Sequence, residues 1–271
     1  MSIITEMFSY PFAVRAAVAG VLISVCAALL GVNLVLKRFS MLGDGLSHVS
    51  FGAAAVALAV GAAPLKVSIP VVIIAAFFLL RMNGSSKIRG DAAIALVSSS
   101  ALAIGVIVAS MTTGMNTDIS NYMFGSILTV SRGDVVLAVL IACAVAALYI
   151  FFYEKVFSCA FDESFAAATG VRVKLYNSVT AVLTAITVVI GMRIMGALLI
   201  SSIITFPALS AMRVCKRYSG VMAVSCIVAA VSFAVGLTAS FVFNMPAGAA
   251  VVVTDLAVFL VFTAFAKAKQ K

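Results

Sequence analysis

The chain alternates long apolar runs with short polar segments from residue 12 almost to its end. Nine runs are long enough to cross a bilayer as a helix, which takes about 20 apolar residues. Inside lipid every backbone N–H and C=O must be paired, so a span is a helix or a barrel strand, and barrel strands alternate apolar and polar residues. The runs here are unbroken and therefore predict helices. They cover 12–36, 42–60, 64–80, 92–112, 134–153, 175–192, 196–212, 219–243 and 248–266.

Composition agrees with this pattern. Of the 271 residues, 64% are hydrophobic and 10% are charged, and the mean hydropathy is +1.25. Soluble proteins are about 45–50% apolar and about 25% charged. We therefore expect an all-α, polytopic transmembrane helical bundle of about 8–9 spans that forms one domain over 1–271. Eight spans would result if one run were re-entrant or the first were peripheral. The more polar segment 113–131 predicts a short helix at the membrane surface.

The positive charges indicate how the bundle is oriented. The net charge is +9, and the cations lie between the apolar runs, so they report topology rather than a nucleic-acid partner. All but four of the 18 Lys and Arg residues fall in 37–41, 81–91, 154–174, 213–218 and the C-terminal tail. The positive-inside rule places these segments in the cytoplasm and the N-terminus outside. The four exceptions are Arg15, Lys66, Arg132 and Arg193.

Asp44 and His48 are the sharpest chemical feature of the sequence. Four residues apart on a helix, they project from one face, and His48 is the single histidine of the chain. Ionisable residues inside a membrane usually face the bundle interior and mark ion pathways. A carboxylate beside an imidazole suits Zn²⁺, Mn²⁺ or Fe²⁺. On spacing alone, Asp44 as a helix cap and His48 as a hydrogen-bonded core residue explain the pair better than a metal path does.

The largest cytoplasmic segment, 154–174, predicts a short amphipathic helix. Asp162 can cap it, Glu163 adds an acidic side chain to its first turn, and Gly170 suits its C-terminal end. Phe161 and Phe165 would lie on one face at i, i+4 spacing. Such a helix either docks on a partner or lies on the lipid surface.

Other candidate residues have simpler interpretations. Asp91 is expected to cap the fourth span, Asp255 to make an interhelical contact or line a lumen, and Arg193 to snorkel. The methionines near 191–196 are compatible with a path for copper ions, although methionine side chains more commonly fill the core. The five cysteines form no CxxC pair and are expected to pack as small apolar side chains. The chain has no phosphate-binding loop, nucleophile elbow or zinc-protease pair.

The chain resembles the metal-ion ABC-3 permeases, the membrane subunits of bacterial zinc, manganese and iron importers. Five blocks carry the resemblance along nearly the whole chain, and the first and fourth combine uncommon residues at fixed spacing. They are Arg38-Phe-Ser-Met-Leu-Gly-Asp-Gly-Leu-Ser-His-Val-Ser-Phe-Gly52, Arg89-Gly-Asp-Ala-Ala-Ile94, Tyr122-Met-Phe-Gly-Ser-Ile-Leu128, Phe161-Asp-Glu-Ser-Phe-Ala-Ala-Ala-Thr-Gly170 and Gly196-Ala-Leu-Leu-Ile-Ser with Pro207-Ala. The Ser-His-Val-Ser pattern is slightly more similar to the zinc branch.

The resemblance implies a type II-importer-like permease that pairs with a second copy, with a metal path between the two. Asp44 and His48 would contact the transported Zn²⁺ or Mn²⁺. A separate ATPase subunit would use the ATP, and an extracytoplasmic solute-binding protein would deliver the metal to a bacterial cytoplasmic (inner) membrane. The segment that couples to the ATPase would comprise Phe161, Asp162, Glu163, Phe165, Ala166 and Gly170.

The sequence thus predicts a non-catalytic permease with no covalently bound cofactor. Two other classes stay open. A proton-driven secondary metal transporter could use Asp44 and Asp255 as a relay, although it would need no docking helix. An intramembrane enzyme would need a catalytic pair inside the bilayer, and one histidine is available.

Overall fold

The computed structural model describes the chain except for residues 1–8, 86–89, 113–121, 124, 126–129 and 271. The described residues form helices joined by short turns, with no strand among them. The helices are α2 (Pro11–Leu36), α3 (Leu42–Ala59), α4 (Pro64–Ser85), α5 (Gly90–Met111), α7 (Arg132–Phe151), α8 (Tyr153–Phe161), α9 (Glu163–Ala168), α10 (Val173–Met195), α11 (Ala197–Val214), α12 (Tyr218–Phe243) and α13 (Ala247–Gln270).

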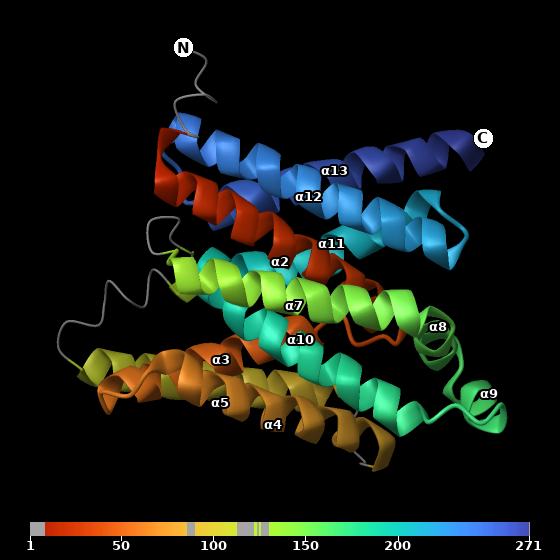
Figure 1. Ribbon diagram of the computed structural model, residues 1–271, viewed down its shortest axis with the longest axis horizontal. Helices are drawn as coiled ribbons and strands as arrows, with labels where there is room; N and C mark the ends of the chain where they lie inside the picture. The colour runs from red at the N-terminus through yellow and green to blue at the C-terminus, as the bar shows by residue number, and fades with distance from the viewer. Residues whose placement is uncertain (1–8, 86–89, 113–121, 124, 126–129, 271) are drawn as a thin grey trace.

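Nine of these helices, all except α8 and α9, are long and apolar enough to span a membrane, as far as the chain is described. The predicted spans are therefore confirmed within a few residues at each end. Figure 1 shows the start of α2 and the end of α13 at opposite ends of the bundle, as an odd number of crossings requires. Most of the predicted surface helix in 113–131 lies outside the described residues.

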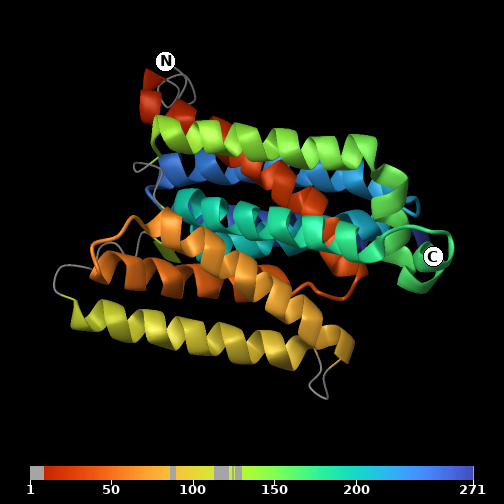
Figure 2. The same ribbon diagram turned by 60° about the horizontal axis from the view of Figure 1, so that its bottom comes forward.

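The helices differ in how much of their surface the bundle buries. About two thirds of the apolar stretches of α2, α3 and α10 is buried, but only 11% of that of α13. Figure 2 shows α3, α4 and α5 grouped on one side of the bundle, with α10 between them and α7. Helices α4, α5 and α13 expose large apolar side chains such as Ile74, Ile107 and Phe265, which suits contact with lipid tails.

Glycines allow the central helices to approach closely. A Cβ added at Gly31 on α2 would lie 2.0 Å from the carbonyl oxygen of Ile204 on α11. A Cβ at Gly52 on α3 would lie 2.5 Å from the carbonyl oxygen of Ala101 on α5. Small residues at helix interfaces are typical of membrane bundles, where close packing drives association.

Candidate metal site and coupling segment

A rigid turn connects α2 to α3 and determines where Asp44 lies. Arg38 adopts the left-handed conformation, with φ of 62°. Its N–H donates to the Val35 carbonyl, and the Phe39 N–H donates to the Leu34 carbonyl. These two bonds form the Schellman motif that ends many helices, here with arginine at the position usually held by glycine. The Leu42 N–H then donates to the Phe39 carbonyl and starts α3, with Asp44 in its first turn.

The first turn of α3 lies well inside the bundle. Gly43 packs on the side chain of Ile204, which is near the middle of α11, and Gly45 packs on Ile94 of α5. Asp44 is therefore flanked by two glycines in tight interhelical contacts. The Gly43 contact is with a side chain near the middle of α11, whereas Ile94, the contact of Gly45, lies about one turn into α5.

The structure brings Asp44 and His48 together on one face of α3. His48 Nε2 lies 3.6 Å from Asp44 Oδ2, slightly beyond hydrogen-bond distance. Two ligands of one tetrahedral ion, at metal–ligand distances near 2.1 Å, lie about 3.4 Å apart. The pair can therefore bind one divalent ion with little rearrangement.

The face that carries this pair is open. Helix α3 is the most buried of the nine span candidates in the described chain, yet the side chains of Asp44 and His48 are 40% and 23% exposed. As far as the chain is described, Asp44 makes no capping hydrogen bond to α3, and His48 has no hydrogen bond within the bundle. The interpretation of Asp44 as a cap and His48 as a satisfied core residue therefore does not describe these side chains.

Two side chains from one copy of the chain would make an incomplete metal site. Among the described residues, no group of three or more His, Cys, Asp or Glu side chains could hold a metal ion. Met192 and Met195 are buried in the core, which fits packing rather than a copper path. Two metal ligands on an open face leave room for ligands from outside this chain.

The coupling segment consists of two helices rather than one. Asp162 has an extended backbone, which ends α8 and starts α9, and its carboxylate accepts from the N–H groups of Ser164 and Phe165 at 2.8 and 3.0 Å. The predicted cap is therefore correct. The prediction that Phe161 and Phe165 share one helix is wrong, because the break at Asp162 places them on α8 and α9.

The two phenylalanines nevertheless remain on the surface. Phe161 is 77% exposed and Phe165 is 62% exposed, whereas Ala166 is completely buried. Gly170, with φ of 83°, ends α9 in a second Schellman motif, in which the Val171 N–H donates to the Ala166 carbonyl. The segment thus presents apolar side chains outward from a well-anchored base.

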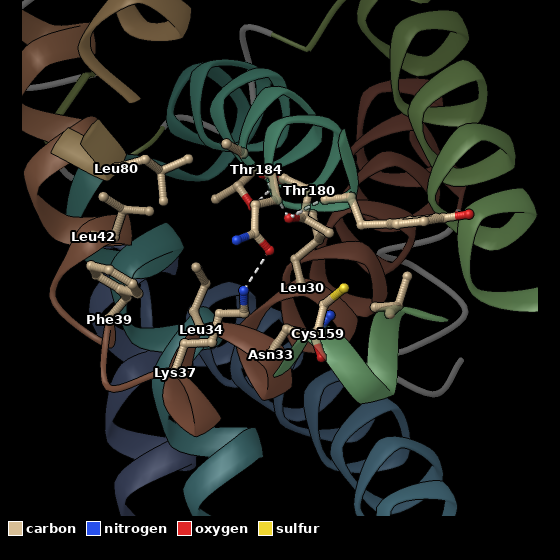
Figure 3. A pocket seen from close by; sticks show the side chains of 14 residues that line it. Leu30, Asn33, Leu34, Lys37, Phe39, Leu42, Leu80, Cys159, Thr180 and Thr184 are labelled. Atoms are coloured by element: carbon tan, nitrogen blue, oxygen red, sulfur yellow. Dashed lines mark hydrogen bonds between the residues drawn. The ribbon is translucent and has the colours of Figure 1, made fainter. Parts of the chain in front are cut away.

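A polar cluster of Lys37, Glu163 and Asn177 anchors α9, and the sequence analysis did not identify it. Lys37 Nζ donates to Glu163 Oε1 at 2.8 Å and to Asn177 Oδ1, and Asn177 Nδ2 donates to Glu163 Oε1 at 2.9 Å. Figure 3 shows Lys37 beside a small cavity, which Asn177 also lines. Partial burial tends to raise the pKa of Glu163, but the two hydrogen bonds and the Lys37 charge outweigh it, so this pKa is below its ordinary value.

The remaining candidates differ from expectation in detail. Asp91 lies in the first turn of α5, which begins at Gly90, so it is not the residue before the helix. Arg193 does not simply snorkel, because its Nε lies 3.3 Å from Asp134 Oδ1. Asp255 is fully buried and faces Ser232, and neither carboxylate oxygen has a hydrogen-bond partner among the described residues.

The sequence of this chain is similar to that of known transport proteins. The model of the ABC 3 transport family matches residues 9–266. The manganese transport system membrane protein MntC of Listeria monocytogenes is 27% identical, over 98% of this chain and 95% of its own length. The high-affinity zinc uptake system membrane protein ZnuB of Haemophilus influenzae is 24% identical, over 90% and 94%.

Solved structures agree with this result. PsaBC from Streptococcus pneumoniae, solved in complex with Fab, superposes with a TM-score of 0.86 at 26% identity and covers 98% of both chains. An inward-facing putative metal-chelate type ABC transporter shares the fold at a TM-score of 0.77 and 14% identity, over 93% of this chain and 85% of the other. This chain belongs to the ABC 3 transport family.

Proposed function

We propose that this chain is the permease subunit of an ATP-driven importer of a divalent transition metal, and that Asp44 and His48 bind the metal in transit. The observation that carries this proposal is the 3.6 Å separation of His48 Nε2 and Asp44 Oδ2 on the open face of α3. A weak site with few ligands suits transport, because the ion must also leave. The chain would act as one transmembrane domain in the cytoplasmic membrane.

The ligand types favour particular metals. One carboxylate oxygen and one imidazole nitrogen suit Zn²⁺, Mn²⁺ and Fe²⁺, whereas Cu(I) prefers thiolate and thioether sulfur. The Ser-His-Val-Ser pattern around His48 slightly favours zinc. Relatives of this chain are named for manganese and for zinc, so the metal is to be decided by measurement.

A second copy of the chain would complete the site. If the open faces of two α3 helices met across a two-fold axis, the path would contain two Asp44 carboxylates and two His48 imidazoles. Four such ligands complete the tetrahedral shell that Zn²⁺ prefers, and added waters would complete the larger shell of Mn²⁺. We therefore propose a homodimeric permease that receives metal from an extracytoplasmic solute-binding protein.

The coupling segment would dock on a separate ATPase subunit. Phe161 and Phe165 are large apolar side chains exposed at the end of the bundle that the positive charges place in the cytoplasm. The chain contains no phosphate-binding loop, so we assign ATP hydrolysis to the partner and no catalysis to this chain.

Uptake into vesicles tests the proposal. The permease, its ATPase and its binding protein are reconstituted, and Zn²⁺, Mn²⁺ and Fe²⁺ uptake is measured with ATP alone and with a proton gradient alone. We expect uptake that requires ATP and both partners. Uptake by the permease alone, driven by the proton gradient, would instead establish a secondary transporter.

The arrangement of the two acidic residues also bears on the proton-coupled alternative. Asp255 is buried on α13, which packs on α11 and α12, whereas Asp44 is on α3, which packs on α4, α5, α10 and α11. A proton relay between the two carboxyls would have to cross the packed α11. The geometry therefore favours the ATP-driven importer.

A further inference from the structure

The cluster of Lys37, Glu163 and Asn177 joins the end of α2 to two consecutive helices, α9 and α10, whose bonded residues lie 126 and 140 positions later in the sequence. Lys37 is the residue at the C-terminal end of α2, Glu163 is the first residue of α9, and Asn177 lies one turn into α10. Each side chain is bonded to both of the others. The three therefore form a closed triangle, and moving one element strains two contacts.

The environment of Lys37 makes this triangle more than a surface ion pair. Exposed ion pairs contribute little, because water and salt screen them. The Lys37 side chain is only 15% exposed, so most of it is removed from water. The Glu163 side chain is 56% exposed, so solvent weakens the pair from that side, while the largely buried Lys37 ammonium keeps a cost for losing its two acceptors.

Lys37 is also connected rigidly to the metal-binding helix. It lies directly before Arg38, whose left-handed conformation and two backbone bonds fix the turn, and α3 begins five residues after it. Helix α9 packs on α8 and α10. The contact of the Lys37 ammonium with Glu163 connects it to α2 as well. A displacement of α9 is thereby passed to the turn that holds Asp44.

The two sides of α9 have different partners. Phe165 points outward, where we have proposed that the ATPase docks, while the Glu163 carboxylate is bonded to Lys37 and Asn177. A six-residue helix capped at both ends is short enough to move as one body. It can therefore receive a movement on one side and transmit it on the other.

We propose that Lys37 is a positioning residue that couples α9 to the first turn of α3, so that ATPase movement changes the position of Asp44. The inference rests on the proposed docking role of the coupling segment. It goes further by naming the residue that transmits the movement, although Lys37 contacts neither metal nor nucleotide.

The test compares Lys37→Met and Glu163→Gln with the double exchange Lys37→Glu with Glu163→Lys. The readout is the number of metal ions imported per ATP hydrolysed in reconstituted vesicles, with complex assembly checked by size-exclusion chromatography. We expect each single variant to lower this ratio by at least about 5-fold, the lower end of typical coupling between sites. The double exchange should recover much of it, because the Asn177 amide can turn to serve either arrangement.

Two controls keep the inference separable from the proposed function. Lys216→Met removes an exposed cation from the α11–α12 turn at the same end of the bundle and should leave the ratio unchanged. Lys37→Arg keeps the charge and serves if Lys37→Met does not assemble. Binding of the ATPase to Lys37→Met is measured separately and should match the wild type.

An unchanged ratio in the single variants would overturn the inference. So would a parallel loss of uptake and ATP hydrolysis that left the ratio intact, since that is the result of a merely structural role. Failure of the proposed function has a different signature. In that case the wild-type complex itself would show no ATP-dependent uptake, or Phe165→Asp would bind the ATPase normally.

Discussion

Arg193 Nε lies 3.3 Å from Asp134 Oδ1, and this ion pair joins the C-terminal end of α10 to the start of α7. Asp134 is nearly completely buried and also completes a capping box with Ser131, whose backbone N–H donates to Asp134 Oδ2 at 2.9 Å. One carboxylate thus holds a helix start and an interhelical contact. The positions of α7 and α10 on the outer side depend on it.

Arg193→Met should therefore destabilise the protein. The substitution leaves the buried Asp134 carboxylate without its cation. Interactions with charged groups contribute about 1.5–3 kcal/mol to stability, and we expect a loss at the lower end because the arginine is partly exposed. Thermal unfolding in detergent measures the change. The matched control is Arg132→Gln, an exposed cation at the same end, which should change the unfolding temperature little. Equal unfolding temperatures for both variants would contradict the role of the pair.

Close approach of α2 to α11 predicts a large effect of one methyl group. Gly31→Ala places a Cβ about 2.0 Å from the Ile204 carbonyl oxygen, and backbone atoms cannot move aside cheaply. We expect destabilisation of about 1–3 kcal/mol or more, as for overpacked cores. In Gly133→Ala the new Cβ meets its nearest atom at 3.6 Å, so helix propensity should stabilise that variant by about 0.5–1 kcal/mol. Thermal unfolding of both variants gives opposite signs if the packing is as described.

The spans could be predicted because their signal is local. An unbroken apolar run specifies a membrane helix whatever its neighbours are, and Asp162 and Gly170 mark helix ends through their own backbone preferences. Local patterns did not reveal that Asp162 ends one helix as well as starting the next. Phe161 and Phe165 were consequently placed on one helix, because their spacing is compatible with that arrangement.

The depth of Asp44 and the anchoring of α9 depend on long-range contacts. Asp44 lies between α11 and α5 because Gly43 and Gly45 pack on those helices, and nothing near Lys37 in sequence indicates this. Lys37 and Glu163 are 126 positions apart. The positive charge of Lys37 contributes to the predicted topology, but charge counting cannot identify which carboxylate a lysine contacts.

The depressed pKa of Glu163 predicts the pH dependence of the α9 anchor. Because this pKa is lower in the folded protein than the ordinary value of about 4.3, the anchor is fully present above that pH and is lost as the pH falls through the lower, folded value. The amide protons of α9 should therefore stay protected from hydrogen exchange near neutral pH and lose protection only in acid. Glu163→Gln should lack this acid step, and an acid step of the same size in that variant would assign it to another group.

Asp255 provides a test of the proton-relay alternative. Its carboxyl is buried against Ser232, without a hydrogen-bond partner among the described residues, and a buried polar group without a partner costs about 1–3 kcal/mol. Asp255→Leu should therefore leave the unfolding temperature unchanged or raise it, and Asp255→Asn should retain ATP-driven uptake. Loss of uptake in a folded, assembled Asp255→Asn complex would instead place this carboxyl in the transport mechanism.

The most direct test of the central claim is a double-mutant cycle on Asp44 and His48, measured as ATP-dependent metal uptake by the reconstituted complex. Asp44→Asn, His48→Gln and the double variant are compared, with Asp91→Asn as the control for loss of a carboxylate elsewhere. If both side chains bind one ion, each single variant should lose nearly as much uptake as the double variant, because effects of residues that act as a unit are not additive. Wild-type uptake in a folded, assembled double variant would contradict the account.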